Sequence, residues 1–238
     1  KITYIGYEPP APRGEAIVVP ANSNIKSVAD LKGKKVVLNK GSNVHYLLVK
    51  ALENAGLKYS DIETVFLAPA DARAAFERGS VDAWVIWDPF LAAAETSIGA
   101  KVLKDGTNTV NNHQFYLAEE SYASKRADIV AIIFEELKKV NDWAISKPKE
   151  VANALAPLTG LDVVTLEKAL SRGGYGINYL NNNVITEQQK IADTFYDLKL
   201  IPKKIDIKSV VWLPEQKKII QGKEDVIKYI LVYSNIWR

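Results

Sequence analysis

Two short segments of the chain carry residue types that together can hold a small anion against an apolar wall. The first, residues 41–46 (Gly-Ser-Asn-Val-His-Tyr), stands where an apolar strand gives way to a helix. Gly41 permits a tight turn there, and Ser42 or Asn43 can cap the helix. A helix start leaves backbone N–H groups unpaired at the positive end of the helix dipole. We therefore predict an anion site with Ser42 and Asn43 as ligand contacts, a role compatible with the simpler one of helix capping.

The second segment, residues 85–90 (Val-Ile-Trp-Asp-Pro-Phe), ends another apolar strand with an indole, a carboxylate and a phenyl ring. Ligands of open α/β sheets bind at the carboxyl ends of the strands, so Trp87 is predicted to wall the site. Packing in the core is the alternative for Trp87, because most tryptophan side chains are largely buried. Asp88 is predicted to cap the following helix, since a carboxylate would repel an anion.

The chain contains two histidines, His45 and His113, and no cysteine. These numbers exclude a disulfide scaffold, a thiol nucleophile and a metal site rich in histidine or cysteine, so we predict no cofactor. His45 falls in the first turn of the helix after Ser42, where the positive helix end disfavours a protonated imidazole. A ligand contact and a packing role are both open for His45.

The composition is that of a globular protein with a substantial core. Of the 238 residues, 47% are hydrophobic and 25% are charged, which are ordinary proportions. The net charge of +3 is spread over single and paired lysines, so no nucleic-acid partner is expected. No apolar stretch approaches the roughly 20 residues of a membrane span. Because the chain has no methionine and no signal peptide, we expect it to be processed, excised or incomplete.

Strands alternate with helices in the first half of the chain, which predicts an α/β lobe with a mainly parallel sheet. After residue 119 the pattern becomes almost entirely helical. The predicted strands are 2–7, 15–19, 35–39, 62–67, 82–87, 101–103 and 114–118. The predicted helices are 27–31, 43–55, 70–78, 89–96, 127–145, 148–156, 163–171 and 185–198.

Several segments in combination give the chain a family resemblance. They are residues 30–36, 41–48, 69–76, 81–90, 112–116 and 187–193. Over roughly residues 1–213 the chain resembles the aliphatic sulfonate-binding proteins of ABC importers. The resemblance implies a two-lobed periplasmic-binding-protein fold that closes over a small sulfonate anion and delivers it to an ABC permease without chemistry. It also implies a periplasmic or extracellular, membrane-associated location.

The resemblance divides the chain into four parts. Residues 1–20 are a first-lobe remnant and crossover, 21–112 a complete second lobe, 113–213 a crossover and first-lobe helices, and 214–238 a tail outside the resemblance. His113 falls at the second crossover, where the cleft opens, and is expected to bind ligand. Because the family has further strands before residue 1, the first lobe is expected to be truncated. Self-association or pairing with a complementing N-terminal segment is then expected, and the apolar run 226–233 is a candidate pairing strand.

Two other functions remain open at this level. A desulfinase-like enzyme on the same fold is the first, but such relatives use a nucleophilic cysteine, which this chain lacks. The chain also lacks a Gly-x-Ser-x-Gly elbow, an HExxH motif and a glycine-rich phosphate loop. An inactive, truncated fragment with exposed apolar helix faces is the second.

Overall fold

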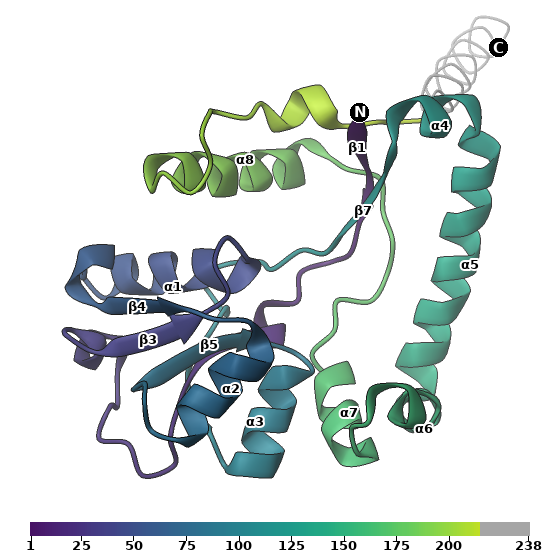
Figure 1. The fold of residues 1–238 in the computed structure, drawn as a ribbon. Helices are drawn as coiled ribbons and strands as arrows, with labels where there is room; N and C mark the ends of the chain where they lie inside the picture. The colour runs from purple at the N-terminus through teal and green to yellow at the C-terminus, as the bar shows by residue number, and fades with distance from the viewer. Residues whose placement is uncertain (215–238) are drawn as a thin grey trace, which may run out of the picture.

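The computed structural model of the chain describes residues 1–214, so the predicted strand at 226–233 lies outside the described residues. Figure 1 shows an α/β lobe, at the lower left, and a second part made of a two-stranded ribbon and helices. The described elements begin and end within a few residues of the predicted ones, apart from four short helical segments that the sequence pattern did not reveal. They are α4 (Glu120–Lys125) and the 3₁₀ turns η1 (Pro12–Gly14), η3 (Tyr59–Asp61) and η4 (Ile207–Val210).

The α/β lobe is a five-stranded sheet in the order β4-β3-β5-β2-β6. Its strands are β2 (Glu15–Val19), β3 (Lys35–Leu38), β4 (Glu63–Phe66), β5 (Ala83–Trp87) and β6 (Lys101–Asp105). Its helices are α1 (Asn43–Asn54), α2 (Pro69–Glu77) and α3 (Phe90–Ile98), with short 3₁₀ turns η1 (Pro12–Gly14), η2 (Val28–Leu31) and η3 (Tyr59–Asp61).

Alternate residues of each strand contribute to two separate hydrophobic cores, because successive side chains point to opposite faces of a sheet. Ile17 of β2 and Val36 of β3 pack with Leu48 of α1 on one face. Val18 of β2 packs with Trp84 of β5 on the other face, which α2 and α3 cover. In Figure 1, α1 lies above the sheet and the other two helices lie below it.

Strand β2 corrects the predicted organisation of this lobe. Strands β3, β4 and β5 are mutually parallel, as expected. Strand β2 lies between β5 and β6 and runs antiparallel to both, so the sheet is mixed. The sequence analysis assigned residues 15–19 to the segment that precedes the lobe. All five residues of β2 are buried, and burial on both faces requires a place in the middle of a sheet rather than in a connection.

The second part has a much smaller core. Strand β1 (Ile2–Tyr7) pairs antiparallel with β7 (Phe115–Glu119), and only Ile5, Ala123, Val130 and Phe134 form the buried cluster described beside this ribbon. The remaining helices are α5 (Ala127–Ser146), α6 (Pro148–Thr159), α7 (Val163–Leu170) and α8 (Asn182–Asp197).

Three chain segments run together where the two parts join. The backbone N–H of Glu8 donates to the carbonyl of Gln114 (2.9 Å), and that of Ala11 donates to the carbonyl of Asn111 (3.0 Å). Tyr7 and Asn178, in the segment between α7 and α8, exchange two further backbone hydrogen bonds of 2.9 and 3.0 Å. The first two connections, about residues 8–11 and 111–114, are therefore shorter than the predicted crossovers, and a third segment lies beside them.

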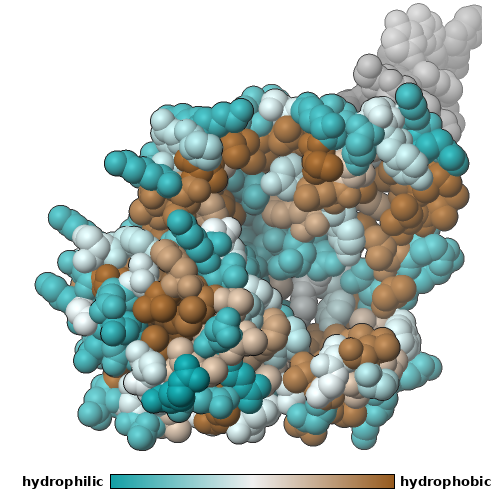
Figure 2. Space-filling view, in the orientation of Figure 1, coloured by the Kyte–Doolittle hydropathy of each residue, from teal (hydrophilic) through white to brown (hydrophobic). Residues whose placement is uncertain are grey.

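Apolar side chains remain exposed on the helices of the second part. On α5, Ile132, Val140 and Ile145 are each more than half exposed, and Leu158 of α6 is 80% exposed. Figure 2 shows apolar residues on the right-hand side of the molecule, where α5 runs, and a hollow between the two parts. An amphipathic helix normally buries such residues against a neighbour, so α5 presents an uncovered apolar face.

Candidate functional site

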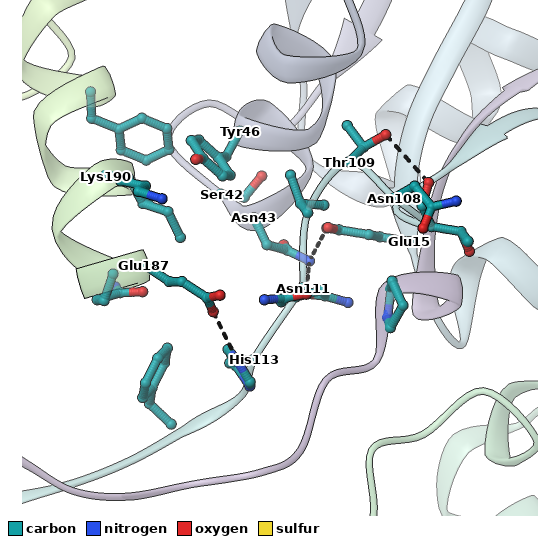
Figure 3. A pocket seen from close by; sticks show the side chains of 18 of the residues that line it. Glu15, Ser42, Asn43, Tyr46, Asn108, Thr109, Asn111, His113, Glu187 and Lys190 are labelled. Carbon is teal, nitrogen blue, oxygen red and sulfur yellow. Dashed lines mark hydrogen bonds and ion pairs between the residues drawn. The ribbon is translucent and has the colours of Figure 1, made fainter. Parts of the chain in front are cut away.

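A cavity of about 590 Å³ lies between the start of α1 and the side of α8. Residues 107–113 and Phe115 close it on the side of the connecting segments (Figure 3). Its aromatic and aliphatic walls are Tyr46, Val110, Phe115, Ile191 and Phe195, and its polar lining includes Glu15, Ser42, Asn43, Asn112, His113, Glu187 and Lys190. The volume suits a small organic ligand.

Ser42 occupies the N-cap position of α1 and lines the cavity, as predicted, but it does not cap the helix through its side chain. Its hydroxyl instead donates to the carbonyl of Asn39 at 2.8 Å. The N–H groups of the first turn of α1 are consequently left without a side-chain acceptor. This arrangement leaves the positive end of the helix available to an anion.

Asn43 joins the helix start to a buried carboxyl group. Its amide Nδ2 donates to Oε2 of Glu15 at 2.6 Å and to Oδ1 of Asn112 at 3.1 Å (Figure 3). Glu15 is only 1% exposed, and burial raises the pKa of its carboxyl group to about 8, with the hydrogen bond from Asn43 opposing part of that rise. At neutral pH this carboxyl group is therefore protonated and uncharged.

His45 is fully buried and does not line the cavity, so the structure gives it the packing role rather than the ligand contact. The backbone N–H of Gly41 donates to its Nδ1 (3.1 Å), so Nε2 carries the proton and donates to Oη of Tyr59 (2.7 Å). Burial, together with the charge of Lys40, lowers the pKa of His45 to about 4. His45 thus holds the turn that precedes Ser42. It shares the inner face of α1 with Leu48, which helical spacing dictates.

Trp87, which the sequence analysis predicts as a wall of the site, does not line this cavity. Its half-buried ring packs against both cores of the α/β lobe and lies edge-on to Phe90, with ring centroids 6.2 Å apart. The residue directly opposite it on β2 is Glu15, which does reach the cavity. Asp88 acts as predicted, because its Oδ1 accepts a hydrogen bond from the backbone N–H of Ala92 in the first turn of α3 (2.9 Å).

His113 lies in the cavity lining, where the sequence placed it, and its side chain is only 8% exposed. Its Nδ1 donates to the carbonyl of Glu8 at 2.9 Å, because a carbonyl can only accept. Its Nε2 lies 3.2 Å from Oε2 of Glu187 on α8. His113 therefore connects both linking segments to α8 across the cavity (Figure 3).

Most of the lining residues were not identified as ligand contacts from the sequence, among them Tyr46, Glu15 and Lys190. Among the described residues that line the cavity, Lys190 carries the only lysine or arginine side chain. Glu187, Lys190 and Ile191 follow helical spacing, so all three face the cavity from α8. The sequence shows this spacing, but it does not show which face of α8 lies toward α1.

Two kinds of feature are not found in the described part of the chain. Within residues 1–214 no group of three or more histidine, aspartate or glutamate side chains is placed to hold a metal ion. None of the helices described there combines the length and apolarity that crossing a membrane requires.

Known proteins match both the sequence and this architecture. The NMT1/THI5 like family matches residues 13–151. An Escherichia coli relative named as an aliphatic sulfonates-binding protein is 43% identical over 224 residues, which make up 94% of this chain and 69% of that protein. The crystal structure of the periplasmic aliphatic sulphonate binding protein SsuA from Escherichia coli matches with a TM-score of 0.86 at 43% identity, over 90% of this chain and 70% of that one.

A second solved structure is that of the alkanesulfonate-binding protein SsuA from Xanthomonas axonopodis pv. citri bound to MOPS. It matches with a TM-score of 0.82 at 35% identity, over 89% of this chain and 73% of that one. The fold of the chain is thus the α/β fold of periplasmic binding proteins, and the named relatives are binding proteins rather than enzymes. The chain belongs to the family of aliphatic sulfonate-binding proteins of ABC transporters.

Proposed function

We propose that this chain captures a small aliphatic sulfonate in the cavity between α1 and α8 and performs no chemistry on it. One observation carries the proposal: the first-turn N–H groups of α1, uncapped by any side chain, border a cavity with aromatic and aliphatic walls. These N–H groups suit the sulfonate oxygens. Tyr46, Phe115 and Phe195 suit the carbon chain.

The charge around the cavity agrees with a singly charged anion. Lys190 supplies one cation, the carboxyl group of Glu187 faces His113, and Glu15 carries no charge at neutral pH. Ser42, Asn43 and His113 are proposed as ligand contacts. MOPS, the ligand in the Xanthomonas structure, is itself a sulfonate with a bulky organic group. A ligand that bridges α1 and α8 would favour a closed arrangement of the two parts, which an ABC permease can recognise on the outer face of the membrane.

The test is a titration of the chain with methanesulfonate and octanesulfonate, followed by chemical shifts of backbone amides. We expect saturable shifts at Ser42 and Asn43, with tighter binding of the longer ligand because it buries more apolar surface. Octylammonium, with the same carbon chain and the opposite charge, is the control. Absence of saturable shifts with either sulfonate would contradict the proposal, as would release of sulfite during incubation, which indicates a desulfinase.

We also propose that the second part of the fold is an incomplete first lobe, which a complementing segment or a second copy of the chain covers. The two-stranded ribbon, the small core around Phe134 and the exposed residues of α5 support this view. Leaving such apolar surface in water forgoes about 25 cal/mol per Å². Sedimentation velocity at rising protein concentration tests it. We expect association that Ile132→Lys combined with Val140→Lys weakens, and a stable monomer with tight sulfonate binding would contradict it.

A further inference from the structure

Glu15 is a buried acidic side chain that sits, unexpectedly, in a cavity proposed to bind anions. It is 1% exposed and reaches the cavity beside the start of α1. A carboxylate at this position would repel an anionic head group and would compete with it for the positive end of the helix dipole. Either Glu15 prevents anion binding in this cavity, or its carboxyl group is protonated and uncharged there.

The hydrogen bonds around Glu15 distinguish these two cases. Oε2 accepts from Asn43, whose amide hydrogens also reach Asn112, and no hydrogen bond to Oε1 is found among the described residues. No lysine or arginine pairs with Glu15 in the described chain, although buried carboxylates are normally paired. A carboxyl group in this setting is most stable with a proton on its free oxygen, and that oxygen then becomes a donor.

We propose that Glu15 is a specificity-determining residue whose protonated carboxyl group donates a hydrogen bond to an oxygen of the ligand's sulfonate group. The inference rests on the proposed function, since it names how that same cavity recognises its anion. It adds a neutral side-chain donor beside the backbone N–H groups at the start of α1. The proposal also predicts that Glu15 does not attract a cationic ligand near neutral pH, because its side chain is uncharged there.

The proposal has a definite dependence on pH. Burial raises the pKa of Glu15 to about 8, so the free protein keeps the proton below that pH and loses it above. Sulfonate binding then requires uptake of a proton at higher pH, and the dissociation constant rises by about tenfold per pH unit. Below pH 7 Glu15 stays protonated, so the affinity for the sulfonate no longer changes with its titration.

Other ionisable groups near the cavity have to be separated from Glu15 in the experiment. Lys190 and the His113–Glu187 pair line the cavity, and Asp88 and Asp105 end the two strands that flank β2. Asp88 lies against Arg172, and burial raises its pKa to about 6, which is below that of Glu15. Glu187 is the useful matched residue, because it is the other carboxyl group that lines the cavity.

The decisive experiment measures the affinity for methanesulfonate, which stays a monoanion throughout, by amide chemical shifts from pH 6 to pH 9.5. We expect a constant affinity up to about pH 7.5 and a decline above about pH 8 in the wild type. Glu15→Gln keeps a neutral donor at the same place, so we expect it to bind methanesulfonate and to lose the decline. Glu187→Gln should keep the decline, whatever its affinity.

A second measurement needs no ligand and guards against a misfolded variant. The infrared band of a protonated carboxyl group should persist in the free wild-type protein at pH 7, disappear as the pH passes about 8, and be absent from Glu15→Gln. An ionised Glu15 at pH 7, or an affinity that stays constant to pH 9.5, would overturn the inference while leaving the proposed function intact. Failure of the wild type to bind methanesulfonate at every pH would overturn the proposed function and this inference with it.

Discussion

Arg172, just after α7, places its Nη2 2.5 Å from Oε2 of Glu95 on α3, and this contact joins the helical part of the molecule to the α/β lobe. Asp88 lies 3.5 Å from the other terminal nitrogen of Arg172, and Lys168 lies 3.1 Å from Glu95. The side chains of Arg172, Glu95 and Asp88 are all less than 15% exposed. The cluster is thus a buried ion network at the second place where the two parts meet.

Replacing Arg172 is expected to be strongly destabilising. Arg172→Met keeps the apolar stem and leaves Glu95 and Asp88 as buried carboxylates with Lys168 as the remaining cation, which costs about 3–5 kcal/mol of unfolding free energy. Urea unfolding followed by circular dichroism measures the loss. The control is Arg126→Met, because Arg126 and its partner Asp128 are both about half exposed or more, and such pairs contribute little. Equal losses in both variants would contradict this account.

The buried imidazole of His45 makes stability sensitive to mild acid. Its pKa is lowered from 6.5 to about 4 in the folded chain, so the unfolded chain takes up the proton first. The contribution to stability is complete above pH 6.5 and declines as the pH falls toward 4, by about 2 kcal/mol between pH 7.5 and pH 5. His45→Asn, which can still accept the hydrogen bond from Gly41, should lose most of this pH dependence. A wild-type urea midpoint that does not change between these pH values would count against it.

Gly174 is expected to be irreplaceable where the third connecting segment passes the first. A Cβ atom on Gly174 would collide with the backbone carbonyl of Pro9, and backbone cannot yield as a flexible side chain can. We expect Gly174→Ala to cost about 1–3 kcal/mol and to weaken sulfonate binding by moving the linking segments. Gly14→Ala is the control, since its nearest neighbour would be the Asn112 side chain at 3.6 Å. Thermal unfolding of both variants tests the difference.

Asn43→Asp separates the anion site from the stability of the helix. A carboxylate in the first turn of α1 interacts favourably with the helix dipole, which offsets part of the loss of the hydrogen bonds that the Asn43 amide donates to Glu15 and Asn112. The same charge stands beside the proposed sulfonate position and repels the anion, and each tenfold loss of affinity corresponds to about 1.4 kcal/mol. We expect at least a tenfold weaker affinity for methanesulfonate and a smaller loss of unfolding free energy. Unchanged affinity would place the anion elsewhere.

Much of the fold could be predicted because its signals are local. The alternation of strands and helices, the glycine turns and the helical spacing of apolar residues each depend on neighbours in sequence. The position of β2 could not be predicted that way, because its partners β5 and β6 lie more than 60 residues away. The sequence Glu-Ala-Ile-Val-Val is equally compatible with parallel and with antiparallel pairing in the sheet.

The candidate site was predicted in part for the same reason. Ser42 and Asn43 follow from the turn at Gly41, which is a local feature. The sequence left His45 open between a ligand contact and packing, and it predicted Trp87 at the site from its position along a strand. The orientation of each ring depends on tertiary neighbours, Tyr59 for His45 and Phe90 for Trp87. Glu15 received little attention because burial, which gives it its unusual proton affinity, is not visible in a sequence.

The central position of β2 also sets an order of events during synthesis. Residues 15–19 leave the ribosome early, but both strands that flank β2 are complete only when residue 105 has been made. At roughly 5–20 residues per second, the chain waits several seconds with an apolar strand that has no permanent partner. The sheet of the lobe can therefore be completed only after β6 has been made, although β3, β4 and β5 can pair with one another before that.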